Sequence, residues 1–411
     1  MKKKLLQVGI EVNSGSTGRI AEQIGSVALQ NGYESYITYA RGYNPSESKV
    51  LKIGNKFSFY MHVLRTRIFG DHLNGSKLST LKLIKSVKSI KPDIIHLHQI
   101  HGYYLNVPLF FDFLKKYNKP VVWTLHDCWA FTGHCTYFLL EKENCNKWTH
   151  ECNNCPKINN YPKSIYFDNS KHSFQTKKRL FNSLQNLTIA GVSNWMANQA
   201  KQSFLNNNCT EITSVLNGVD TKLFYPRRNR RQILEKFNLD KNNLYLIATG
   251  TTWIKAKGLE DYSKLSKMLH KNIQLILVGI DSKIAKKMPS NIKCLERTES
   301  QNELAELYSI SEILLCLSYQ ESFGLTPIEA MSCGTPAIVY DNTALSELVD
   351  ENTGELVETG NLVLVLSAIN KILNKGKMFY HQTCIDYVRD KYEKEITYKN
   401  YIKIYKRLLK K

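Results

Sequence analysis

Short apolar segments that read as β-strands alternate with helical patterns along most of the chain. In the first half, the predicted strands are residues 5–12, 36–39, 93–98, 121–125 and 187–192. In the second half, they are residues 244–249, 273–279, 292–295, 313–317 and 336–340. Strands separated by helices form parallel sheets with helices on their faces. The pattern therefore predicts an α/β fold with two doubly wound, Rossmann-like domains.

A change in composition separates the two series. Residues 220–243 include the charged stretch FYPRRNRRQ, which contains Pro226 and is typical of an interdomain linker. We predict an N-terminal domain over residues 1–220, a C-terminal domain over 221–385, and a last helix over 386–411 that crosses back to the first domain. Two such domains are expected to face each other across a cleft, at the carboxyl ends of both sheets.

Charge and hydropathy limit the choice of partners and location. The 56 Lys and Arg residues exceed the 36 Asp and Glu residues by 20, and such a surface attracts polyanions. No apolar run approaches the ~20 residues that span a bilayer. The start MKKKLLQVGI reads as a strand and not as a signal peptide, so we expect a cytoplasmic protein. The sequence has no recognisable nucleic-acid module, so we predict no nucleic-acid partner.

The basic carboxy-terminal run, residues 399–411, has apolar residues at helical spacing. Two interpretations stay open for this stripe. We favour docking on the protein's own core. The alternative is peripheral attachment to the anionic cytoplasmic face of the inner membrane.

The stretch SYQESFGLTPIEAMSCGTPAIV, residues 318–339, is the most informative part of the sequence. Thr326 is expected to cap a helix, with Pro327 in its first turn and Gly334 at its end. A helix amino terminus after a strand favours a diphosphate, and Gly324 would let the backbone approach that anion closely. The carboxylates of Glu321 and Glu329 would accept hydrogen bonds from sugar hydroxyls.

This string resembles the donor-site motif of the retaining family-4 glycosyltransferases, which adopt the two-domain GT-B fold. The resemblance implies that Glu321 lies at the donor sugar and that Glu329 binds the nucleotide ribose. It also assigns the intervening loop and helix start to donor binding, namely Ser322, Phe323, Gly324, Leu325 and Thr326. The alternative is a helix-capping Glu and a surface Glu without function.

Other segments match this family in the same order along nearly the whole chain. NSGSTGRI resembles its Gly-rich loop, in which Gly15 and Gly18 would approach the diphosphate and the sugar. In TGTTWIKAKGLE, Lys257 matches the lysine that grips the diphosphate, but Thr251 stands where the family has an arginine. Lys255 or Arg297 is expected to substitute, although a lysine lacks the planar bidentate grip of arginine.

His126 follows the predicted strand 121–125, and in related enzymes a His at this point contacts the donor sugar. We assign it to donor orientation or leaving-group stabilisation, with a structural histidine as the alternative. Asp127 would orient His126 or cap the next turn. His96, His98 and His101 would line the acceptor side or face solvent at a strand end.

Five cysteines fall within residues 128–156, and a subset of bacterial family-4 enzymes has a similar Cys-rich insertion. Cys152 and Cys155 have the two-residue gap of a zinc knuckle. A structural zinc held by Cys135, Cys145, Cys152 and Cys155, with His134 or His150 as alternates, is one prediction. Reduced cysteines without a metal are the other.

Taken together, the resemblance implies a metal-independent, retaining hexosyltransferase. It would use a UDP-, GDP- or dTDP-sugar and need no further cofactor for catalysis. The expected acceptor is a glycan, in the leading interpretation a lipid-linked oligosaccharide of bacterial capsule, exopolysaccharide or O-antigen synthesis. The alternatives are a nucleotide-sugar epimerase or phosphorylase on the same fold, and a non-catalytic sugar-nucleotide-binding subunit.

Overall fold

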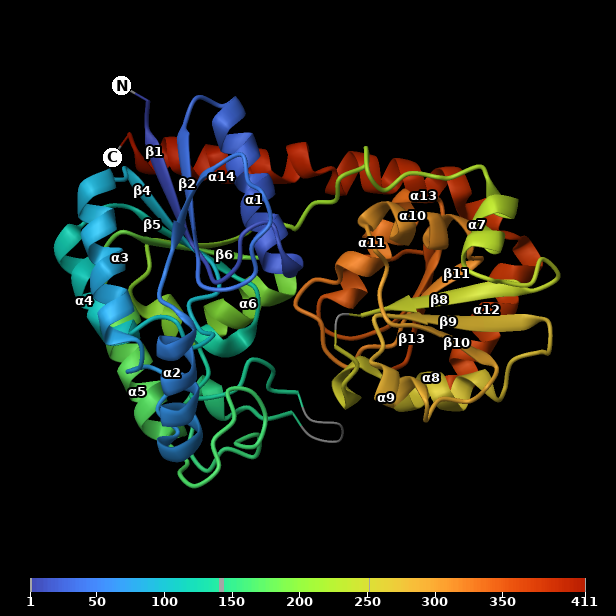
Figure 1. The fold of residues 1–411 in the computed structure, drawn as a ribbon, viewed down its shortest axis with the longest axis horizontal. Helices are drawn as coiled ribbons and strands as arrows, with labels where there is room; N and C mark the ends of the chain where they lie inside the picture. The colour runs from blue at the N-terminus through green and yellow to red at the C-terminus, as the bar shows by residue number, and fades with distance from the viewer. Residues whose placement is uncertain (1, 140–143, 251, 411) are drawn as a thin grey trace. The chain divides into compact units, whose positions relative to one another are not determined.

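The computed structural model describes residues 2–139, 144–250 and 252–410. Contacts divide the chain into two compact units (Figure 1). Unit 1 comprises Met1–Leu216 and Thr397–Lys411, and unit 2 comprises Asn217–Ile396. Within the described ranges, no helix has both the length and the apolar character that a membrane crossing requires.

Unit 1 is built on a seven-stranded sheet in the order β3-β2-β1-β4-β5-β6-β7, and every adjacent pair is parallel. Its strands are β1 (Lys4–Val8), β2 (Glu34–Tyr39), β3 (Lys49–Lys52), β4 (Ile94–Leu97), β5 (Val121–Leu125), β6 (Leu187–Gly191) and β7 (Glu211–Ser214). Its helices are α1 (Gly15–Gln30), α2 (Lys56–Phe69), α3 (Lys77–Ile90), α4 (Val107–Tyr117), α5 (Ser170–Phe181), α6 (Asn194–Gln202) and α14 (Lys394–Leu408). Figure 1 shows α3 and α4 on one face of the sheet and α1 and α14 on the other.

Unit 2 has a six-stranded parallel sheet in the order β10-β9-β8-β11-β12-β13. Its strands are β8 (Leu244–Thr249), β9 (Ile273–Val278), β10 (Ile292–Leu295), β11 (Ile313–Cys316), β12 (Ala337–Tyr340) and β13 (Gly354–Val357). Its helices are α7 (Arg230–Lys236), α8 (Leu259–Ser266), α9 (Ser282–Ala285), α10 (Gln301–Ile310), α11 (Leu325–Ser332), α12 (Leu362–Lys375) and α13 (Lys377–Tyr392). In Figure 1, α10, α11 and α13 cover one face and α8, α9 and α12 the other.

Continuous apolar runs explain why the central strands form where they do. All residues of β5 and β11 are buried, as expected for parallel strands covered by helices on both faces. The α/β class with two doubly wound domains is thereby confirmed. In each sheet the strand order reverses once, between β1 and β4 in unit 1 and between β8 and β11 in unit 2. These switch points are where open α/β sheets bind ligands.

The ends of the units differ from the predicted boundaries. Helix α13 belongs to unit 2, although residues from 386 onward were predicted to leave it. The reason is a backbone pairing that closes unit 2, in which Val219 N donates to Tyr392 O at 2.8 Å and Lys394 N donates to Val219 O at 3.0 Å. The predicted linker 220–243 is also not wholly irregular, because it contains α7.

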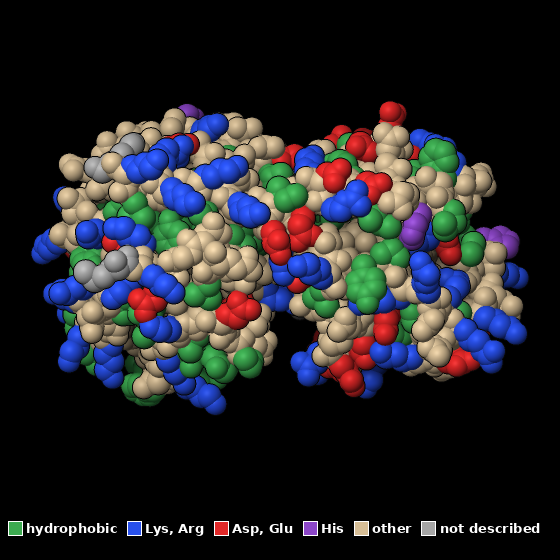
Figure 2. All heavy atoms as spheres, turned by 90° about the horizontal axis from the view of Figure 1, so that it is seen from above, with side chains coloured by type: hydrophobic (Ala, Val, Ile, Leu, Met, Phe, Trp, Pro, Cys, Tyr) green, Lys and Arg blue, Asp and Glu red, His purple; other side chains and the backbone are tan. Residues whose placement is uncertain are grey.

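The carboxy-terminal stripe docks on its own unit. Tyr401, Ile402, Tyr405 and Leu408 of α14 are buried, and Tyr405 Oη lies 2.6 Å from Nδ1 of His96. This contact supports the favoured interpretation of the stripe and leaves its apolar residues covered. Lys and Arg side chains instead dominate much of the unit 1 surface seen in Figure 2, whereas basic and acidic side chains mix on unit 2.

Candidate donor site in unit 2

The predicted donor-site residues of unit 2 gather in two loops at its switch point. One loop follows β8 and leads through the 3₁₀ turn Lys255–Lys257 into α8. The other follows β11 and leads into α11. Because β8 and β11 are hydrogen-bonded neighbours, both loops leave the sheet at adjacent carboxyl ends. Tyr319 N donates to Ala256 O at 2.9 Å and joins them.

A close backbone approach fixes the first of these loops. Gly258 has φ of +73°, and a Cβ there would lie 2.1 Å from the carbonyl oxygen of Leu317. Only glycine combines this left-handed conformation with such a contact. The turn that carries Lys257 is therefore held against the end of β11.

Lys257 and Glu321 form an ion pair between Nζ and Oε1. The Lys257 side chain is 29% exposed and that of Glu321 is 15% exposed, so the pair is partly desolvated yet open to solvent on one side. The backbone N of Glu321 donates to Oγ1 of Thr343 at 3.1 Å, which anchors the loop to the segment after β12. A cation and an acceptor of hydroxyl hydrogen bonds thus lie together at the switch point.

The start of α11 differs from the prediction. The N-cap is Gly324, with φ of +100°, and Thr326 lies inside the first turn without a capping side-chain bond. A Cβ at Gly324 would come within 2.9 Å of both Leu345 and Leu348, so the loop needs glycine here. The first N–H groups of α11 are those of Leu325, Thr326 and the residues after them, and such groups favour an anion. The helix ends at Ser332, and Gly334 follows with φ of +74°, as a terminator should.

Glu329 is buried on α11 and does not reach the surface as a capping or solvent-facing group. Its Oε2 accepts a hydrogen bond from Tyr308 Oη at 3.2 Å, and Tyr308 Oη lies 3.0 Å from Oγ1 of Thr249, the last residue of β8. Glu329 is thereby tied to the same strand end that carries the Lys257 loop. Its predicted contact with ribose stays a prediction.

The other predicted donor residues are placed less uniformly. Phe323 is buried and packs edge-on against Tyr392, with ring centroids 6.0 Å apart, so its side chain anchors the loop. Ser322 is partly exposed beside it. Arg297 is exposed after β10, which β9 separates from β8. Lys255 begins the same turn as Lys257, whereas Thr251 lies outside the described residues.

Sequence reasoning missed the acid that organises these loops. Asp261 on α8 is buried, and its Oδ2 accepts hydrogen bonds from Tyr319 Oη at 2.9 Å and Tyr340 Oη at 2.7 Å. The next residue, Tyr262, donates to Leu315 O and accepts from Leu317 N. An isolated Asp in a helix belongs to no sequence motif, so the role of Asp261 could not be predicted without the fold.

In unit 1, the Gly-rich loop encloses an acidic side chain. A Cβ at Gly15 would lie 2.3 Å from Oε2 of Glu11, and one at Gly18 would lie 3.0 Å from Cβ of Glu11. The glycines therefore make room for Glu11. Burial raises the pKa of Glu11, while Arg41 and Arg19 act in the opposite direction. The structure gives Gly15 and Gly18 a local packing role, and their contact with a diphosphate stays a prediction.

His126 lies just after β5 in a chain of hydrogen bonds. The amide nitrogen of Gln7, Nε2, donates a hydrogen bond to Ala21 O. The amide oxygen of Gln7, Oε1, therefore faces His98 and accepts a hydrogen bond from His98 Nε2 at 2.9 Å. Nδ1 of His98 then accepts from Nε2 of His126 at 3.0 Å. Burial lowers the pKa of His126 to about 4, so the ring is neutral at pH 7 with Nδ1 as an acceptor. This tautomer suits a sugar hydroxyl better than an anionic leaving group.

The three histidines near β4 are buried and do not face solvent. His96 is held by Tyr405 and Thr124, which is a structural role. Asp127 does not orient His126. Its Oδ1 caps the turn Cys128–Ala130 by accepting from Trp129 N, and its Oδ2 lies 2.8 Å from Nε2 of His101.

The cysteines of the insertion line one small cavity, whose wall includes Cys135, Cys145, Cys152 and Cys155. None of the ten cysteines forms a disulfide. Within the described ranges, no group of three or more His, Cys, Asp or Glu side chains is arranged to hold a metal ion. The four thiols thus share a cavity but do not converge as zinc ligands. Both the structural zinc and the metal-free thiols stay predictions.

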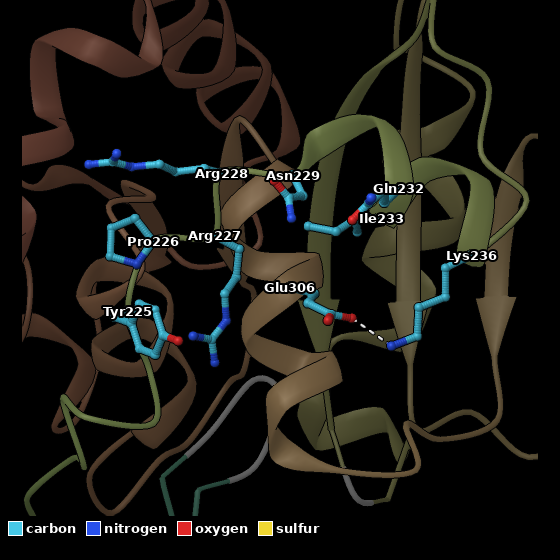
Figure 3. Close-up of a pocket in the computed structure, with 9 residues that line it drawn as sticks. All are labelled: Tyr225, Pro226, Arg227, Arg228, Asn229, Gln232, Ile233, Lys236 and Glu306. Carbon is cyan, nitrogen blue, oxygen red and sulfur yellow. Dashed lines mark hydrogen bonds and ion pairs between the residues drawn. The ribbon is translucent and has the colours of Figure 1, made fainter.

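Unit 2 also has a hollow away from these two loops. It measures about 570 Å³ and is lined by the linker segment with Arg227 and by α7 and α10 (Figure 3). Lys236 and Glu306 form an ion pair at 2.7 Å across its wall. None of the predicted donor-site residues lines this hollow, so its size does not identify the site.

Comparison with known proteins adds evidence from outside the chain. Residues 229–390 match the family model described as glycosyl transferases group 1. The chain is 24% identical over 369 residues to the putative colanic acid biosynthesis glycosyl transferase WcaC of Escherichia coli K12, an alignment that covers 86% of this chain and 87% of the relative.

Two solved structures are similar along almost the whole chain. Sucrose-phosphate synthase of Thermosynechococcus elongatus has a TM-score of 0.70 and 15% identity, with 99% of each chain covered. HepE of Anabaena in complex with UDP-glucose has a TM-score of 0.65 and 12% identity, with 98% of each chain covered. At these identities the likeness concerns the fold, which is GT-B. Residues 229–390 therefore carry the match to the group 1 glycosyltransferases, and the whole chain has the GT-B fold.

Proposed function

We propose that the chain transfers a hexosyl group from a nucleoside diphosphate sugar to a lipid-linked glycan during bacterial surface polysaccharide synthesis. The observation that carries this proposal is the Lys257–Glu321 ion pair at the switch point of unit 2, beside the amino terminus of α11. A diphosphate needs cations and N–H donors, and a sugar needs acceptors for its hydroxyls. The name of the E. coli relative supports the polysaccharide role, and the complex of HepE with UDP-glucose supports the class of donor.

In this proposal, Lys257 leaves Glu321 and contacts the diphosphate when the donor binds. The carboxylate of Glu321 is then available to the hydroxyls of the transferred sugar. Charge on the departing nucleoside diphosphate is neutralised by Lys257 and by the first N–H groups of α11, without a metal. Lys255, on the same turn, supplies the second cation in place of the arginine that related enzymes use.

The sugar would pass through an oxocarbenium-like state and keep its anomeric configuration. We assign Glu321 to holding the sugar hydroxyls in that state, and no residue to a covalent intermediate. The acceptor would attack from the face that the diphosphate leaves. The stereochemistry of the product tests this point directly.

Transfer assays with matched lysine variants test the role of the site. Lys257→Ala removes one preorganised donor. We expect it to raise the activation free energy of transfer by about 3 kcal/mol, which lowers the transfer rate roughly a hundredfold. Lys236→Ala breaks an ion pair with Glu303 and Glu306 in the same unit, away from the loops, and is expected to leave the rate unchanged. Equal rates for the two variants would remove Lys257 from the mechanism.

Two other functions are separated by the products. An epimerase would convert the nucleotide sugar without an acceptor, and a phosphorylase would need inorganic phosphate. A non-catalytic subunit would bind nucleotide without any conversion. Chromatography of donor incubated with and without acceptor distinguishes all of these from transfer.

A further inference from the structure

Helix α2 of unit 1 carries a stripe of exposed apolar side chains. Phe57, Tyr60, Met61 and Leu64 are spaced i, i+3, i+4 and i+7, so they form one stripe along the helix. Each is between 49% and 74% exposed. The only buried residues of α2 are His62 and Thr66, both polar. This is the reverse of the usual arrangement, in which the apolar stripe of a surface helix faces the core.

Hydrogen bonds on the buried side fix this orientation. His62 Nδ1 lies 3.0 Å from Ser76 Oγ, and its Nε2 lies 3.2 Å from His72 O. Arg65 forms an ion pair at 2.6 Å with Asp71, which is itself buried. Rotating the apolar stripe inward would break these contacts and leave buried polar groups without partners. The stripe is therefore held outward by the fold of unit 1.

A neighbouring loop extends the stripe. Ile165, Tyr166 and Phe167 are between 54% and 73% exposed. Ile165 N donates to Arg67 O at 2.8 Å, and the rings of Phe167 and Phe69 stack with centroids 6.5 Å apart. We call the stripe of α2, Phe69 and this loop together the α2 face. A group of exposed apolar side chains of this kind is typical of an interaction site.

The charge around the α2 face indicates its partner. Residues 49–91 contain ten Lys and Arg residues and a single acid, Asp71, which is paired with Arg65. Lys56, Arg67 and Lys163 are exposed at the α2 face itself. A second copy of the chain would place this basic surface against itself in a twofold interface. An anionic bilayer offers both an apolar interior for the aromatic side chains and negative headgroups for the lysines.

We infer that the α2 face docks unit 1 on the interfacial region of an anionic phospholipid bilayer. Phe57, Tyr60 and Leu64 would enter the boundary between headgroups and acyl chains, while Lys56 and Arg67 contact the phosphates. This inference goes beyond the proposed function, because it needs neither a donor nor an acceptor. It also assigns membrane contact to α2 in place of α14, whose apolar residues from Tyr398 to Leu408 are buried.

The test measures co-sedimentation of the full chain with vesicles. One set contains phosphatidylglycerol and phosphatidylethanolamine, and the other contains phosphatidylcholine alone. The variant F57S/Y60S/L64S removes the stripe. The control V363S/M378S/F379S removes three equally exposed apolar side chains from unit 2. A third variant, K56Q/R67Q, reduces the charge of the α2 face. Unfolding temperatures establish that each variant is folded.

We expect the wild type and the control to bind the anionic vesicles and not the neutral ones. The stripe variant should lose roughly tenfold or more of its partitioning, and the charge variant should bind less and respond less to salt. The inference is overturned if the stripe variant partitions like the wild type, or if both serine variants lose binding equally. A wild type that binds no vesicles, and that forms a dimer which the stripe variant abolishes, would also overturn the inference.

Nucleotide binding is measured on the same samples and reports unit 2 independently. A chain that binds no nucleotide but loses vesicle binding only in the stripe variant would contradict the proposed donor site and support this inference. Normal nucleotide binding without any vesicle binding would support the proposed donor site and contradict the membrane inference.

Discussion

The ion pair of Lys257 with Glu321 is the contact on which the proposed donor site rests. Each charge is partly withdrawn from water, so each one needs its partner or a ligand that replaces it. A nucleotide sugar would supply both replacements at once, a diphosphate for the lysine and hydroxyls for the carboxylate. The ion pair therefore keeps both side chains at the place where they would contact the donor.

A double-mutant cycle should reveal this coupling in the unfolding free energy. We expect K257A or E321Q alone to lower it by about 1 kcal/mol, because each leaves a partly buried group without its partner. The double variant should cost less than the sum of the two. The cycle K236A with E306Q, on a surface pair of the same unit, serves as the reference. Additive losses at Lys257 and Glu321 would mean that the pair contributes nothing.

Sequence motifs predicted roles for Lys257, Glu321 and Glu329, because each lies in a string of residue types that resembles one family's motif. The residues that orient them were not predictable. Asp261 and Tyr308 act through hydrogen bonds to side chains distant in sequence, and no local pattern marks them. The tautomer of His126 likewise depends on Gln7, 119 positions earlier by the numbering, and becomes readable only when β1, β4 and β5 are adjacent.

Among the elements, the turn that ends at Gly258 leaves no room for a side chain. We expect G258A to abolish nucleotide binding, because its Cβ would collide with Leu317 O and shift the Lys257 turn. G376A is the control, since Gly376 has a similar φ of +78° and nothing within 4 Å of its Cβ position. Thermal shifts with nucleotide distinguish the two. Retained binding in G258A would show that the turn can adjust without loss of the site.

Helix α14 should contribute to unit 1 through two tyrosines. Tyr405 is hydrogen-bonded to His96, and Tyr401 Oη lies 2.8 Å from Oγ1 of Thr124. Removing either hydroxyl takes a hydrogen-bond partner from a buried polar group, so Y401F and Y405F should each lower the unfolding free energy by about 1 kcal/mol. Denaturant titration measures this loss. Variants as stable as the wild type would show that α14 is held by its apolar face alone.

The central strands were predictable because they are continuous apolar runs, whereas three of the four edge strands were not. β3, β7 and β13 have the sequences KVLK, EITS and GELV, and each has only one or two strongly apolar residues. An edge strand is covered less completely, so its sequence need not be apolar throughout. Helix α7 was hidden for a similar reason, since its charged sequence RRQILEK resembles a linker.

At the scale of the whole molecule, the two units should differ in acid. Burial lowers the pKa of His96 to about 3 and those of His62, His126 and His134 to about 4, and all four belong to unit 1. The unfolded chain, with ordinary histidine pKa values near 6.5, binds more protons between about pH 6.5 and 4. The free energy of unfolding of unit 1 therefore decreases as the pH falls from about 6.5 to 4.

Hydrogen exchange followed by peptide mapping tests this difference. Between pH 6.5 and 5, corrected for the intrinsic exchange rate, peptides of unit 1 should lose protection by on the order of 1 kcal/mol or more. Peptides of unit 2 should change less. An equal loss in both units, or a larger loss in unit 2, would contradict the role assigned to the buried histidines.

The central claim is that unit 2 binds a nucleoside diphosphate at the loops after β8 and β11. The most direct measurement is the thermal stabilisation of the full chain by UDP, GDP and dTDP, with and without EDTA, for wild type, E329Q and K236A. A ligand at 100 times its Kd stabilises by about 2.7 kcal/mol. We predict a shift with one nucleotide that survives EDTA and K236A and is reduced in E329Q. No shift with any nucleotide, or equal shifts in all three proteins, would contradict the assignment of the donor site.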